Sequence, residues 1–229
     1  MTKSKQTDSG TGTREALLLA GERLFAENGI DAVSLRQINT AAGQRNSSAA
    51  HYHFGSKDAL VRAIFDYRME RVNRNRQTQL QAALAGHDGA LSVRQIVAIL
   101  VNPIVDEIRD SEGGSFYIRF LSQAIGHPQA RTSHYSESRV VDAAHAAYAQ
   151  LRAAVRDIPE PILGQRFGLM WEMIIHSLAD RERGSQLHMH TRHIEPDPFV
   201  NNLIDAATGA LTAPVAADTA AGPAPRANT

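Results

Sequence analysis

Residues 34–60 read SLRQINTAAGQRNSSAAHYHFGSKDAL, and this stretch decides the fold class that the sequence predicts. Ser34 and Gln37 have the spacing of a capping box, in which side chains and backbone amides at the start of a helix bond reciprocally. Gly43 is placed to end this helix after about two turns, because glycine takes up the left-handed conformation without a Cβ penalty. The pattern therefore predicts a short helix that begins just after Ser34.

A second short helix and a long one follow. Asn46 can cap a helix over Ser47–His53, and Ser56 can cap the helix after it. That last helix begins near Lys57, and if it runs to about Leu84 it is roughly 42 Å long at 1.5 Å per residue. Because the two short helices are too small to bury a core alone, we expect the long helix to pack against them.

Helical patterns also cover the rest of the chain. A first helix begins near Thr13, a suitable N-cap, and ends at Gly29. Its apolar stripe consists of Leu17, Ala20, Gly21, Leu24 and Phe25. Further helices are expected at about 92–110, 115–126, 135–156, 161–184 and 197–211. Since runs with the period-two alternation of strands are missing, the predicted fold class is all-α.

Composition limits the classes of protein to which the chain can belong. The 229 residues include no cysteine, which excludes disulfides and thiolate metal sites. No window approaches 18 consecutive apolar residues and the N-terminus is polar, so we expect a cytoplasmic protein without a membrane span. The net charge is zero, but residues 1–76 carry +4 and residues 77–229 carry −4. This asymmetry supports a DNA-binding module at the N-terminal end.

The short helix after Asn46 has the polarity of a DNA-reading helix. Two helices joined by a glycine turn can place the second in the major groove while the first braces it. Ala50 and Phe54 are spaced to face inward, and the polar positions Ser47, Ser48, His51 and Tyr52 then point outward. Such side chains can hydrogen-bond base edges and phosphates, or pack on a thymine methyl group.

The stretch from Leu17 to Leu60 resembles the DNA-binding domain of the TetR family of bacterial repressors. The matching residues are Leu24–Ala26 with Glu27, Gly29, Ser34–Arg36, Ile38, Ala42, Gly43, Tyr52–Phe54, Ser56, Lys57 and Leu60. The run YHFGSKDAL is the most specific part. The resemblance implies a repressor that binds a palindromic operator in double-stranded DNA as a homodimer, with no cofactor, and responds to a small-molecule effector.

The resemblance also implies roles for individual residues. Arg36 would reach a guanine or a phosphate, and the turn residues Arg45 and Asn46 would lie beside the DNA. Base edges would be read by Ser47, Ser48 and His51, while Tyr52 would contact a base or a phosphate. His53 and Lys57 would hold phosphates, aided by the amides at the start of the long helix.

Two features depart from the family pattern. Phe54 lies eleven residues after Gly43, one more than is common in the family, and we place the extra residue in the turn, at Gln44 or Arg45. Asn39 stands where the family usually has a small apolar residue, and we expect it to hydrogen-bond locally. The expected organisation is a disordered tail at 1–10, a helix-turn-helix DNA-binding domain at 11–57, a helical effector-binding and dimerisation domain at 58–212, and a disordered tail at 213–229.

The larger domain contains a set of aromatic, methionine and histidine residues at helical spacing. They are either plain core or the lining of a pocket for a small apolar or aromatic effector. The set consists of Phe116, Tyr117, Phe120, His145, Tyr148, Phe167, Met170, Trp171, Met173 and His176.

The last two helices are expected to form an isologous dimer, with a seam of Leu163, Phe167, Leu203, Ile204 and Leu211.

An expected loop contains His188, His190 and His193 with Glu195 and Asp197. Because a loop fixes no ligand geometry, we predict no metal site there. Because no nucleophile elbow, phosphate-binding glycine loop or paired-carboxylate motif is present, we expect no enzyme. An enzyme of unknown type on a helical bundle and a protein-binding helical adaptor stay open as alternatives; the adaptor would show no salt-dependent duplex binding.

Overall fold

The computed structural model describes residues 5–86, 90–109, 115–126, 142–187 and 197–220. Within these ranges the chain is helical and contains no strand, which confirms the all-α prediction. The helices are α1 (Lys5–Asn28), α2 (Leu35–Ala41), α3 (Ala49–Phe54), α4 (Lys57–Ala85), α5 (Val93–Arg109), α6 (Tyr117–Gly126), α7 (Asp142–Ala154), α8 (Glu160–Leu187), α9 (Pro198–Thr212) and α10 (Ala217–Ala220).

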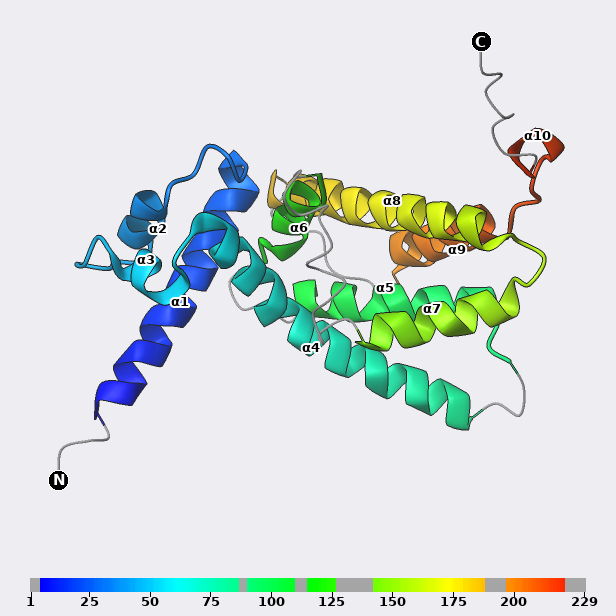
Figure 1. The fold of residues 1–229 in the computed structure, drawn as a ribbon, viewed down its shortest axis with the longest axis horizontal. Helices are drawn as coiled ribbons and strands as arrows, with labels where there is room; N and C mark the ends of the chain where they lie inside the picture. Colours follow the sequence, from blue (N-terminus) through cyan, green and yellow to red (C-terminus); the bar gives the residue numbers. More distant parts are fainter. Residues whose placement is uncertain (1–4, 87–89, 110–114, 127–141, 188–196, 221–229) are drawn as a thin grey trace, which may run out of the picture.

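The first three helices form a small unit at one end of the molecule (Figure 1). The Ser34 capping box is present, with the Gln37 amide donating to Ser34 Oγ and the Ser34 amide donating to Gln37 Oε1. Gly29 and Gly43 have φ of 82° and 65°, the left-handed conformation that ends α1 and α2. These local signals were predicted correctly.

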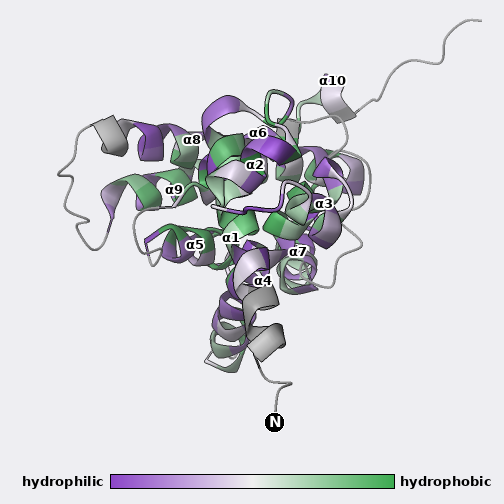
Figure 2. Ribbon diagram, turned by 90° about the vertical axis from the view of Figure 1, so that its left-hand side faces the viewer, coloured by the Kyte–Doolittle hydropathy of each residue, from purple (hydrophilic) through white to green (hydrophobic). Residues whose placement is uncertain are grey.

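The long helix α4 connects this unit to a bundle built from α5 to α9 (Figure 1). The Ser56 hydroxyl accepts from the Ala59 amide, so the predicted cap of α4 is confirmed. A Cβ at Gly21 would lie 3.0 Å from Ile64 Cδ1, which shows how closely α1 and α4 approach. Figure 2 looks onto the end formed by α1–α3, where hydrophilic and hydrophobic residues are mixed along each helix.

Helix α6 packs between α1 and α8 and so joins the small unit to the bundle. The Phe120 ring of α6 lies 6.2 Å from the Phe25 ring of α1, centroid to centroid, and both side chains are fully buried. The small unit and the bundle therefore share one continuous apolar core.

Several predicted boundaries are wrong. Helix α1 begins at Lys5, so Thr13 is not its N-cap and residues 5–10 are helical, not a disordered tail. After α9, the Arg166 guanidinium donates to the carbonyls of Leu211, Ala213 and Pro214, and Val215 packs on the core. The expected disorder from residue 213 therefore fails for these residues, and α10 follows them; residues 135–141 and 221–229 lie outside the described residues.

The residues predicted for the dimer seam are also wrong. Leu163 and Leu211 are fully buried within the single chain, and Leu203 and Ile204 are at most 6% exposed, because α9 packs on α5 and α8. These side chains complete the protomer's own core. Phe167 alone among the five is half-buried.

Candidate nucleic-acid interface and effector site

Helix α3 presents a polar surface at the free end of the small unit. Ala49 and Ala50 are buried against the core. The expected reading residues Ser47, Ser48, His51 and Tyr52 are exposed, and Tyr52 has 85% of its surface accessible. A Tyr ring this exposed can contact a binding partner through both its aromatic face and its hydroxyl.

The turn before α3 is held by Asn39, a residue of α2 that is 2% exposed. Its amide nitrogen donates to the Ser47 carbonyl, and its Oδ1 accepts from the Ala50 amide at 2.8 Å. Its own carbonyl accepts from the Gln44 amide at 2.9 Å. The Asn39 side chain thus satisfies the Ser47 carbonyl and the Ala50 amide, which a small apolar side chain cannot do.

Helix α3 begins two residues later than predicted. Its N-cap is Ser48, not Asn46, and the Asn46 side chain instead accepts from the Ser48 amide at 2.9 Å. Asn46 therefore shapes the turn. Asn46 and Arg45 are both exposed there.

The three residues expected to contact phosphates differ in exposure and in the contacts they make within the protein. Arg36 is exposed on α2. His53 is half-buried, and its ring lies 5.3 Å from Tyr52 and 6.2 Å from Phe54. Lys57 turns back on the protein: its ammonium donates to the carbonyls of Ile30 at 3.0 Å and Asp31 at 3.3 Å. Lys57 therefore closes the loop after α1 as well as standing near the expected DNA surface.

The predicted effector residues do not form one wall. On α6, Tyr117 and Phe120 are fully buried, and Phe120 faces α1 as described above. Phe116 is half-buried, and the Arg119 guanidinium lies 4.9 Å above its ring. This part of the set is core at the junction with the small unit.

A second part of the set forms a row of rings on α7 and α8. The Tyr148 and Phe167 centroids are 4.8 Å apart, and those of Phe167 and Trp171 are 6.0 Å apart, both edge to face. All three rings are half-buried. Of the remaining predicted residues, Met170 is buried, Met173 is half-buried, and His145 and His176 are exposed.

A buried arginine lies at the inner end of this row, and the sequence analysis did not find it. Arg76 of α4 is 1% exposed, and its guanidinium lies 6.0 Å from the Trp171 ring centroid. One terminal nitrogen donates to the Leu100 carbonyl at 3.1 Å, whereas the buried Nε has no hydrogen-bond partner. Burial lowers the pKa of Arg76 to about 10. Sequence gave no signal, because Arg76 stands among other polar residues.

Three charged residues join the small unit to the bundle. Arg68 of α4 donates to both carboxylate oxygens of Glu22 on α1, at 2.7 and 2.9 Å, and to Glu107 of α5 at 2.9 Å. The side chains of Glu22 and Glu107 are 3% exposed and that of Arg68 is 12% exposed. Burial disfavours the charged form of Arg68, but hydrogen bonds and charge from both carboxylates raise its pKa overall. We name these residues the Glu22–Arg68–Glu107 triad.

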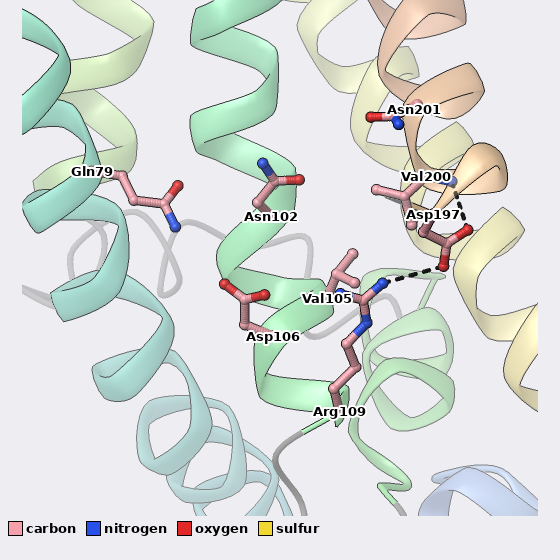
Figure 3. A pocket seen from close by; sticks show the side chains of 8 residues that line it. All are labelled: Gln79, Asn102, Val105, Asp106, Arg109, Asp197, Val200 and Asn201. Carbon is pink, nitrogen blue, oxygen red and sulfur yellow. Dashed lines mark hydrogen bonds and ion pairs between the residues drawn. The ribbon is translucent and has the colours of Figure 1, made fainter. Parts of the chain in front are cut away.

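A polar cleft of about 320 Å³ opens between α4, α5 and α9 (Figure 3). Arg109 points across it to Asp197, whose carboxylate also accepts from Arg181 at 2.9 Å. Burial works to raise the pKa of Asp197, but the hydrogen bond and charge of Arg181, together with two backbone amides, lower it overall. The amide side chains of Gln79, Asn102 and Asn201 complete the polar lining.

Asp197 is the N-cap of α9, with its side chain accepting from the Phe199 and Val200 amides. It is thus committed to the helix and to two arginines, and the four other residues weighed for a metal cluster lie outside the described residues. The described residues contain no group of His, Cys, Asp and Glu able to hold a metal ion. No described helix is both long and apolar enough to cross a bilayer.

Comparisons with known proteins identify a family for the chain. The family model described as bacterial regulatory proteins of the tetR family matches residues 17–64, and the model described as the tetracyclin repressor-like C-terminal domain matches residues 98–210. No curated protein sequence matches the chain. The crystal structure of a TetR-family regulator from Streptomyces coelicolor A3 is 19% identical, covers 93% of this chain and 99% of its own, and superposes with a TM-score of 0.39. On the strength of the two family models, the chain belongs to the TetR family of regulatory proteins.

Proposed function

We propose that this TetR-family regulator is a homodimeric repressor that binds a palindromic operator and leaves it when a small apolar or aromatic effector binds. The observation that carries the proposal is the polarity of α3 and the turn before it, where Ser47, His51 and Tyr52 are exposed while Ala49 and Ala50 are buried in the core. A helix with this polarity can enter the major groove and contact base edges.

Operator binding is tested by selecting duplexes from a random pool and measuring their affinity by fluorescence anisotropy. His51→Ala and Tyr52→Ala should each weaken the selected duplex by roughly 1–3 kcal/mol and leave random duplexes less affected. Gln81→Ala, an exposed change near the far end of α4, is the matched control. Wild-type affinity in both α3 variants, or duplex binding without salt dependence, would contradict the proposal.

The dimer is proposed to use the exposed faces of α8 and α9, since their buried faces complete the protomer. Leu169 of α8 is 68% exposed and Phe199 of α9 is 40% exposed. Around Gly164 and Gly168 of α8 nothing lies within 4 Å of an added Cβ, so a second helix could approach closely. Two copies would place their α3 helices about 34 Å, or a multiple of it, apart on a palindrome.

Light scattering tests the dimer. Leu169→Glu should convert it to monomers and weaken operator binding, because one α3 helix contacts only a few base pairs. Leu84→Glu changes a leucine that is 42% exposed on α4 and should leave the mass unchanged. A wild-type monomer at micromolar concentration would contradict the dimer.

Release of DNA needs a mechanical link between the effector and α3. Helix α4 provides it, because it begins beside α3, carries Arg68 of the triad, and reaches Arg76 two turns later. A small tilt of α4 would change the separation of two α3 helices in a dimer and cost roughly 1–3 kcal/mol, a 5- to 150-fold loss of operator affinity. The effector must bind the tilted state more tightly, since equal affinity for both states shifts nothing.

The proposed effector site is the row of rings formed by Tyr148, Phe167 and Trp171 beside Arg76. A fluorescence screen tests this step, because Trp171 is the chain's one tryptophan. A compound that changes Trp171 emission should also release the labelled operator. Compounds that bind without any effect on operator affinity would contradict ligand-controlled release.

A further inference from the structure

Among the buried arginines that the structure describes, Arg76 differs in having no carboxylate partner. Arg68 is paired with Glu22 and Glu107, and Arg119 is paired with Glu182 at 3.1 Å. Arg76 is more deeply buried than either, yet within the described part of the chain its hydrogen bond goes to the neutral carbonyl of Leu100. A buried guanidinium without an anion is costly, because protein interiors stabilise a charge only when it is paired and hydrogen-bonded.

A second buried polar group close to Arg76 is also unsatisfied. The Tyr117 hydroxyl of α6 is fully buried and has no hydrogen-bond partner. Burial raises the pKa of Tyr117, and the positive charge of Arg76 is near enough to oppose that rise. The Arg76 Nε and the Tyr117 hydroxyl are thus two buried polar groups without a partner in the described part of the chain, which indicates an acceptor supplied from outside the chain.

The row of aromatic rings beside Arg76 indicates what kind of molecule could carry this acceptor. From Arg76 the row runs through Trp171 and Phe167 to Tyr148, whose hydroxyl donates to Glu160 at 2.9 Å. The rings offer apolar surface that is only half-buried in the protomer. The arrangement is amphipathic, with a cation at the buried end and aromatic faces beside it.

We infer that the effector is a small monocarboxylate with an aromatic or aliphatic body, whose carboxylate pairs with the Arg76 guanidinium. This inference rests on the effector site proposed above and names the chemistry that the site selects. A planar guanidinium presents parallel N–H donors that match a carboxylate, and Tyr117 supplies one further donor. One buried positive charge matches one negative charge, which selects monoanions over neutral molecules of the same shape.

The test compares carboxylates with their neutral amides, using 4-phenylbutyrate against 4-phenylbutanamide and decanoate against decanamide. Each is titrated into the full-length protein while Trp171 emission is followed. We expect at least tenfold tighter binding of one carboxylate than of its amide. Equal affinities within both pairs, or no binding by any of the four compounds, would overturn the inference.

Two variants separate recognition from folding. Arg76→Met should abolish the carboxylate preference while the urea midpoint stays the same or rises, because an unpaired buried charge has been removed. Arg76→Lys should retain part of the preference. If Arg76→Met kept the preference, or lost it only by unfolding, the guanidinium would not be the receptor. Operator affinity without ligand is measured on the same samples, so failure of DNA binding is distinguishable from failure of carboxylate recognition.

Discussion

Replacing Arg68 by methionine should destabilise the protein strongly, because the carboxylate of Glu22 would stay buried without its cation. Arg68 makes two hydrogen bonds to Glu22, a side chain that is 3% exposed. Glu107 would keep a contact with Arg71 at 3.3 Å, so Glu22 suffers the larger loss. Breaking a buried ion pair on one side costs about 3–5 kcal/mol, and we expect Arg68→Met to fall near the lower end. Such a loss is a large share of a typical total stability of about 5–15 kcal/mol.

Urea unfolding followed by circular dichroism and by Trp171 emission measures this loss. Arg74→Met is the matched control: Arg74 pairs with Glu70 at 2.6 Å on the same helix, but both side chains are 65% exposed. Removing that surface pair should cost no more than about 0.5 kcal/mol. The two probes also report whether the small unit and the bundle still unfold together.

A double variant, Glu22→Leu with Arg68→Met, separates the charge from the packing. It removes both buried charges of the pair, and we expect it to recover most of the stability lost in Arg68→Met. If Arg68→Met cost no more than Arg74→Met, the triad would not link the small unit to the bundle. Failure of the double variant to recover would assign the loss to packing.

Three further predictions concern the interface and the bundle. Asn39→Ala should lower the free energy of unfolding by about 1–3 kcal/mol, because the Ala50 amide loses its buried acceptor. The variant should also bind the operator more weakly than the wild type does; unchanged operator affinity in the folded variant would contradict the role of Asn39 in holding α3. Lys57→Met should destabilise the DNA-free protein by about 1 kcal/mol through loss of its bond to the Ile30 carbonyl, and a variant as stable as wild type would restrict Lys57 to DNA contacts. Burial raises the pKa of Glu182 to about 7 against an ordinary 4.5, so the folded state holds this proton more tightly than the unfolded state. The resulting contribution to folding stability is fully present below about pH 4.5. It falls by at most roughly 1.4 kcal/mol per pH unit up to about pH 7. Urea midpoints measured across this range should therefore decline more in wild type than in Glu182→Gln, and parallel curves would contradict the shift.

The sequence by itself determined the local architecture of this protein. The Ser34 capping box, the Gly43 turn and the Ser56 cap each depend on atoms within three or four residues, so a single stretch of chain contains the whole interaction. The inward and outward faces of α3 follow from helical periodicity alone, which is why Ala50 and Tyr52 were placed correctly. The start of α1 was not, because Thr13 is a suitable cap that the longer helix does not use.

Only the tertiary structure decided which charges meet and which face of each helix is left open. Arg68 contacts Glu22 across 46 residues, while Arg76, two turns further along the same helix, meets no carboxylate among the described residues. Likewise, Leu203 and Leu163 carry the same apolar signal whether a seam lies between two copies or inside one chain. The hydrophobic effect favours burial of an apolar side chain, but it is non-directional, so it does not determine which surface the side chain packs against. That choice depends on how distant helices pack, and it made the expected dimer seam into core and buried Arg76 within a polar stretch of α4.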